Sequence, residues 1–171
     1  MANAHYSKVT IGGHPIHPMI VGFPIAFYTA GVASLIVYGA GASAFWLQAA
    51  VYLLFAGVVM AGLAAIIGVV DLFVGVPRET AARKTGLVHM ALNLVATILF
   101  AGTAVMLWYR WRTEVEPGVG LPIVLGLVAL GSTVAAGSFG WKLVQTHHVG
   151  IDESVRDERR APELDVAHRG L

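Results

Sequence analysis

Histidines are the side chains of this sequence best suited to chemistry, and most of them lie at the edges of apolar segments. Five of the seven stand at or just inside the end of such a segment: His14, His17, His89, His147 and His148. Asp71 is the only acidic residue within the apolar segments. Imidazole and carboxylate groups ligate transition metals, and imidazole also ligates haem iron. These residue types therefore predict a metal or haem site.

Three uncharged runs determine how many membrane helices the sequence can form. No Asp, Glu, Lys or Arg occurs over residues 9–70, a run of 62, or over 85–109 and 117–141, which are 25 residues each. A helix needs about 20 apolar residues to cross the hydrocarbon core, so the first run holds two crossings and the others one each. The sequence predicts an all-α, integral membrane four-helix bundle with spans at 18–38, 45–74, 85–108 and 121–146.

The composition excludes several classes of protein. Charged residues make up 12% of the chain, against about 25% in ordinary soluble domains, and the mean hydropathy is +0.73. A net charge of +1 without a basic stripe argues against nucleic acid as a partner. The absence of cysteine excludes disulfides, thiolate zinc sites and iron–sulfur clusters with cysteine ligands. The lipid bilayer is the expected surrounding of the four-helix domain (18–146), between a polar N-terminal segment (1–17) and a charged tail (147–171).

The distribution of basic residues predicts the orientation. Four crossings bring both termini to one membrane face, and nine of the 11 Lys and Arg residues lie on that face. Only Arg110 and Arg112 lie on the other. By the positive-inside rule, both termini are expected in the cytoplasm. The histidines near the span ends are then expected at the cytoplasmic end of the bundle.

The third span carries a polar stripe. His89, Asn93 and Thr97 are spaced four residues apart and so lie on one helix face. Polar side chains in a membrane helix face the bundle interior, because lipid would leave their hydrogen-bonding groups unsatisfied. His89 is therefore a candidate ligand, with Asn93 and Thr97 as its supporting partners. On the last span, Gly137 and Gly140 leave room for a flat macrocycle.

Haem b is the first functional hypothesis. Two histidines would ligate the iron, with His89 paired either to His17 or to His147. Arg83 and Lys84, expected in a solvated loop before the third span, would pair with the propionates. Electrons would pass to or from a quinone or a membrane redox complex.

A bare transition-metal ion, such as zinc, iron, copper or manganese, is the second hypothesis. Its ligands would come from one carboxylate and several imidazoles: Asp71, His14, His17, His89 and His147. Asn93 and Thr97 would again support the ligands.

A structural subunit of a membrane complex is the third hypothesis, because the sequence contains no nucleophile–base set and no phosphate-binding loop. In that case Asp71 would pair with a histidine or with Arg78, and Asn93 would bridge helices. Small residues at every fourth position would also permit a homodimer. Whether the protein is an enzyme stays open. A transporter is not expected, since no internal repeat is evident in the sequence.

Several short motifs carry a family resemblance. They are Gly13-His14-Pro15-Ile16-His17-Pro18-Met19, Val21-Gly22-Phe23-Pro24-Ile25, Gly68-Val69-Val70-Asp71, His89-Met90-Ala91-Leu92-Asn93-Leu94, and His147 followed by Val149-Gly150-Ile151. Over about residues 12–151 the chain resembles the bacterial membrane-protein family named domain of unknown function 2231. The resemblance implies a location in the bacterial inner membrane. Some members are fused to Rieske-type or cytochrome-type domains, which implies an electron-transfer setting. Lys142 departs from the family, whose last helix often carries an acidic residue there.

Overall fold

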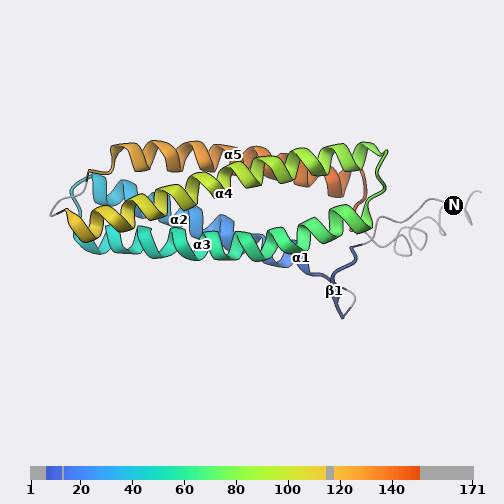
Figure 1. Ribbon diagram of the computed structural model, residues 1–171, viewed down its shortest axis with the longest axis horizontal. Helices are drawn as coiled ribbons and strands as arrows, with labels where there is room; N and C mark the ends of the chain where they lie inside the picture. Colours follow the sequence, from blue (N-terminus) through green and yellow to red (C-terminus); the bar gives the residue numbers. More distant parts are fainter. Residues whose placement is uncertain (1–6, 13, 115–117, 151–171) are drawn as a thin grey trace, which may run out of the picture.

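The structure is a computed structural model that describes residues 7–12, 14–114 and 118–150. Within this part of the chain four helical segments are long and apolar enough to cross a membrane, which confirms the predicted all-α, four-span architecture (Figure 1). The elements, in order, are β1 (Thr10–Ile11), β2 (His14–Pro15), α1 (Ile16–Ile20), α2 (Gly22–Gly39), α3 (Ala44–Val70), the π-helix η1 (Asp71–Gly75), α4 (Ala81–Thr113) and α5 (Gly120–Gln145).

The four crossings alternate in direction along the bundle. Helix α2 packs against α3 and α5, and α4 packs against the same two helices. Figure 1 shows the β1–β2 hairpin, α1, η1, the start of α4 and the end of α5 at one end, which we call the histidine end. The opposite end, called the tryptophan end, holds Trp46, Trp108 and Trp111.

Two helix boundaries differ from the sequence prediction. The first crossing is interrupted at Val21, between α1 and α2. Pro24 explains the break, because it has no N–H to donate to the carbonyl of Ile20 and its ring crowds that carbonyl. The third crossing, α4, is longer than predicted and already begins at Ala81. Thr80 caps its start, with Oγ1 accepting a hydrogen bond of 3.2 Å from the backbone N–H of Arg83.

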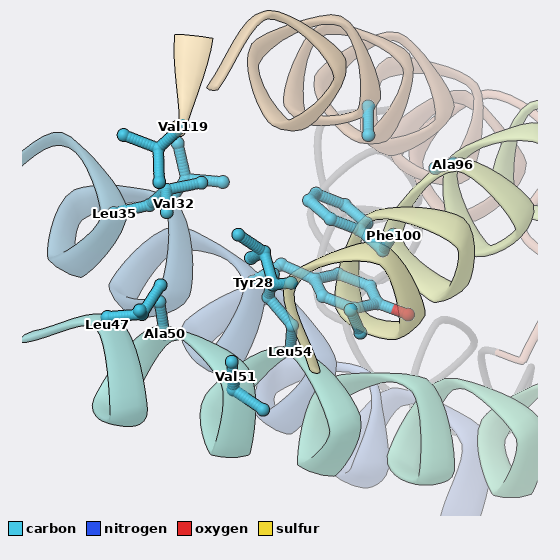
Figure 2. Packing of buried hydrophobic residues seen from close by; sticks show 13 residues of the cluster. Tyr28, Val32, Leu35, Leu47, Ala50, Val51, Leu54, Ala96, Phe100 and Val119 are labelled. Carbon is cyan, nitrogen blue, oxygen red and sulfur yellow. The ribbon is translucent and has the colours of Figure 1, made fainter. Parts of the chain in front are cut away.

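The second half of the bundle repeats the first at an offset of 72 residues. Five of the six buried residues of α2 have a buried counterpart 72 positions later in α4. Five of the six in α3 have one at or after the start of α5. Tyr28 corresponds to Phe100, and these two rings stack on each other with their centroids 3.8 Å apart (Figure 2). Equivalent residues meet in this way across a pseudo-twofold axis, so the expectation of no internal repeat is wrong.

The repeat is hidden in the sequence because few residues are identical. Over positions 16–39 and 44–70, only five match the residue 72 positions later. The matching pairs are His17 and His89, Leu35 and Leu107, Leu53 and Leu125, Ala64 and Ala136, and Gly68 and Gly140.

Large apolar side chains fill only part of the bundle. The main buried cluster, including Leu35, Leu47, Leu54, Phe100 and Leu107, occupies the middle and the tryptophan end (Figure 2). Toward the histidine end, the buried hydrophobic residues of the α3, α4 and α5 cores are alanines: Ala64, Ala96 and Ala136. A separate small cluster around Leu72, Val76 and Ala82 closes the turn between η1 and α4.

Candidate functional site

His17 and His89 are held in the same way by the two halves of the repeat. The Nδ1 atom of His17 lies 2.9 Å from the carbonyl oxygen of Ala64 in α3. The Nδ1 atom of His89 lies 2.7 Å from the carbonyl oxygen of Ala136 in α5. A carbonyl oxygen can only accept, so each Nδ1 carries the proton and each Nε2 keeps its lone pair. Both rings are thereby fixed in the tautomer that ligates a metal through Nε2.

A glycine lies against each imidazole, one helical turn beyond the acceptor carbonyl. A Cβ atom at Gly68 would stand 2.8 Å from Cε1 of His17, and one at Gly140 would stand 3.0 Å from Cε1 of His89. The two glycines therefore create space for the imidazoles themselves. Gly140 does not leave room for a macrocycle as the sequence suggested, whereas a Cβ atom at Gly137 would meet nothing within 4 Å.

The two histidines lie in electrostatic range of each other, and each is partly buried at the histidine end. On α4, Asn93 and Thr97 are partly buried below His89. The side-chain nitrogen of Asn93 lies 3.2 Å from Nε2 of His89 and also donates to the backbone carbonyl of His89 at 2.9 Å. Position 21, which corresponds to Asn93 in the first half, is a valine and offers no such donor.

Tyr28 lies deeper in the bundle, between this site and the packed core. Its side chain is 3% exposed, its ring stacks on Phe100, and a Cβ atom at Gly57 would come within 2.6 Å of that ring. Among the described residues, its hydroxyl is the only buried side-chain polar atom without a hydrogen-bond partner. Figure 2 shows this hydroxyl pointing away from Leu47 and Val119, toward the histidine end. The sequence analysis missed Tyr28; its signal is a tyrosine far from the membrane interface, where tyrosines usually lie.

Asp71 anchors the N-terminal segment instead of joining the histidines. Its Oδ1 atom accepts hydrogen bonds from the backbone N–H groups of Lys8, at 2.8 Å, and Val9, at 3.2 Å. Its Oδ2 atom accepts one from the Ser7 hydroxyl at 2.7 Å. The expectation that Asp71 pairs with a histidine or with Arg78 is therefore wrong. Hydrogen bonds to a carboxylate are strong, so this contact fixes the chain just before His17.

Arg83 is likewise used to stabilise the structure. The prediction that it lies in a solvated loop is wrong, because it is 7% exposed and belongs to α4. Its guanidinium donates to the carbonyls of Leu72 and Val76, the latter at 2.9 Å, and stacks over the Phe73 ring. These carbonyls lie at the end of a helix, where the backbone leaves acceptors without intrahelical donors. Lys84, its neighbour, is exposed.

The remaining predicted ligands lie in different surroundings. Nε2 of His147 lies 3.1 Å from Oγ1 of Thr85, which joins the end of α5 to the start of α4. His14 is exposed in β2, where it pairs with Ile11 of β1. Within residues 7–12, 14–114 and 118–150, no three or more His, Asp or Glu side chains are arranged to hold a metal ion. The five residues considered as a common metal set are thus not brought together, and the pair His17 and His89 remains.

The fold and this pair define an integral membrane protein built from two matched helical hairpins. The family model for predicted membrane proteins with domain of unknown function 2231 matches residues 13–153, and the chain belongs to this family. This confirms the family resemblance in the sequence. No curated protein and no solved structure matches the chain.

Proposed function

We propose that the protein binds haem b between its two hairpins, with His17 and His89 as axial ligands, and transfers electrons in the membrane. The observation that supports this most is the matched setting of the two imidazoles. Each donates Nδ1–H to a backbone carbonyl of the next helix, and each packs on a glycine of that helix. When bound, haem supplies a one-electron couple at its iron.

The donor set fits this group better than it fits a bare ion. Two neutral imidazoles from opposite hairpins suffice for the axial positions of haem iron. A structural zinc ion takes four protein ligands and a catalytic one takes three, which the described residues do not assemble. The hydrogen bonds from Nδ1 keep the rings oriented and raise the basicity of Nε2. The small buried residues Ala64, Ala96 and Ala136 leave the imidazoles as the bulkiest groups in this part of the interior.

The arrangement also supports a side of action. Nine of 11 basic residues lie on the face with the chain termini, so the histidine end belongs on the cytoplasmic side of a bacterial inner membrane, N-in and C-in. A quinone or a membrane redox complex is the electron partner. Lys84, exposed one turn before His89, is the available partner for a propionate, because the Arg83 guanidinium binds carbonyls.

The test is the absorbance spectrum of protein purified from haem-replete cells. We expect a Soret band that shifts on reduction and a pyridine haemochrome of the b type. His17→Ala and His89→Ala should each lose the band, whereas His14→Ala and His147→Ala, which remove histidines at the same end, should keep it. A colourless wild-type protein, or equal haem content in all four variants, would refute the proposal.

A further inference from the structure

The duplication provides an internal reference for each histidine. Both have the same alanine carbonyl on Nδ1 and the same glycine against the ring. They differ at the residue four positions later on the same helix face, which is Val21 after His17 and Asn93 after His89. Among the described residues, Nε2 of His17 has no hydrogen-bond partner, while Nε2 of His89 receives the Asn93 amide at 3.2 Å. The two imidazoles are thus equivalent in placement and unequal at the atom that binds metal.

The direction of the Asn93 hydrogen bond follows from the tautomer. Because Nδ1 of His89 donates to Ala136, its Nε2 is an acceptor, and the Asn93 amide must be the donor. The same lone pair cannot bind iron while it accepts this hydrogen bond. Asn93 is already held by the carbonyl of His89 at 2.9 Å, so it stays in place beside Nε2.

We propose that Asn93 is a positioning residue that makes His89 the weaker of the two axial ligands, so that the reduced site admits a small neutral ligand on the His89 side. This inference rests on the proposed haem binding. The competition amounts to one hydrogen bond, which corresponds to a roughly three- to tenfold reduction in the strength of the His89 bond. Asn93 therefore leaves His89 able to ligate and makes it displaceable. His17, with no competing donor, stays bound.

The experiment measures carbon monoxide binding to the dithionite-reduced wild type and to two variants. Asn93→Val gives the second half the residue of the first, and we expect the apparent carbon monoxide affinity to fall roughly three- to tenfold. The double variant Val21→Asn/Asn93→Val moves the amide beside His17, and we expect it to recover the wild-type affinity. An unchanged affinity in Asn93→Val would overturn the proposal. A double variant that stays weak would also overturn it, since the effect would then come from packing and not from the amide.

A second measurement needs no bound group. In protein labelled with ¹⁵N-histidine and prepared without haem, Asn93→Val should shift the Nε2 resonance of His89 and leave that of His17 unchanged. A His89 resonance that does not move would overturn the inference. If the wild type holds no haem at all, the proposed function fails, whereas this resonance still reports whether Asn93 restrains His89.

Discussion

The two ends of the bundle share one helix arrangement and are filled in different ways. At the tryptophan end, Leu35, Leu47 and Leu107 are fully or almost fully buried. At the histidine end, the same helices bury alanines and place two imidazoles, an asparagine and a tyrosine hydroxyl around the axis. In a membrane, helices are held together by close packing and hydrogen bonds, because lipid is as apolar as leucine. The first end therefore stabilises the fold, and the second end is left free to bind a ligand.

Removing a large side chain from the packed end is expected to have the largest effect on stability. Phe100→Ala removes the ring that stacks on Tyr28 and leaves a cavity, so we expect a loss of about 3–5 kcal/mol. Unfolding in mixed detergent micelles measures it. The exposed Leu94→Ala on the same helix serves as the control and should lose far less. Equal losses would remove the distinction between packed and lipid-facing positions.

Filling the space beside an imidazole should affect the histidine end in a different way. Gly140→Ala places a Cβ atom 3.0 Å from His89 and should cost about 1–3 kcal/mol while displacing the ring, so haem content should fall. Gly137→Ala is the matched control on the same helix, because its Cβ atom meets nothing within 4 Å. Haem content and thermal stability would be compared in both. A loss confined to Gly137→Ala would contradict this description of the site.

Breaking the anchor of the N-terminal segment is expected to have a smaller effect. Asp71→Ala removes three hydrogen bonds that fix residues 7–9, and we expect a loss of about 1–3 kcal/mol. Limited proteolysis near residue 8 should become faster. Glu79→Ala, an exposed acidic residue nearby in the sequence, should change neither quantity. Unchanged cleavage in Asp71→Ala would show that the segment is held by other contacts.

The smallest predicted change has the opposite sign. Tyr28→Phe removes a buried hydroxyl that has no partner among the described residues and makes the stacked pair identical, so we expect stability to rise by about 1 kcal/mol. The same unfolding assay measures it, with Tyr52→Phe on the exposed surface as the control. A destabilised Tyr28→Phe would indicate that the hydroxyl is satisfied in the membrane, for example by water or a ligand.

The sequence predicted the helices well because the signal for a membrane crossing is local. Charge-free runs fix the four spans, and the spacing of His89, Asn93 and Thr97 shows which residues share a face. The ends of helices were less predictable. The capping hydroxyl of Thr80 and the missing N–H of Pro24 decide where α4 begins and α1 breaks.

The partners of charged residues could not be predicted from residue type. Asp71 and Ser7 are 64 positions apart, and nothing in either sequence neighbourhood indicates that they meet. Arg83 looked solvated because arginine usually is, yet the carbonyls of the turn after α3 draw it into the interior. His17 was one of two candidates to pair with His89. It is distinguished by its alanine and glycine 47 and 51 residues later, a correspondence that becomes visible only when the two hairpins are aligned in space.

The 72-residue offset divides the site evenly: each hairpin supplies one imidazole, one acceptor carbonyl and one glycine. An ancestral single hairpin would have required a second copy of itself to assemble the pair, and any change near one ring would have appeared near both. Fusion of the two copies into one polypeptide removes that constraint. The contrast between Val21 and Asn93 is a divergence that a strictly symmetric dimer could never acquire.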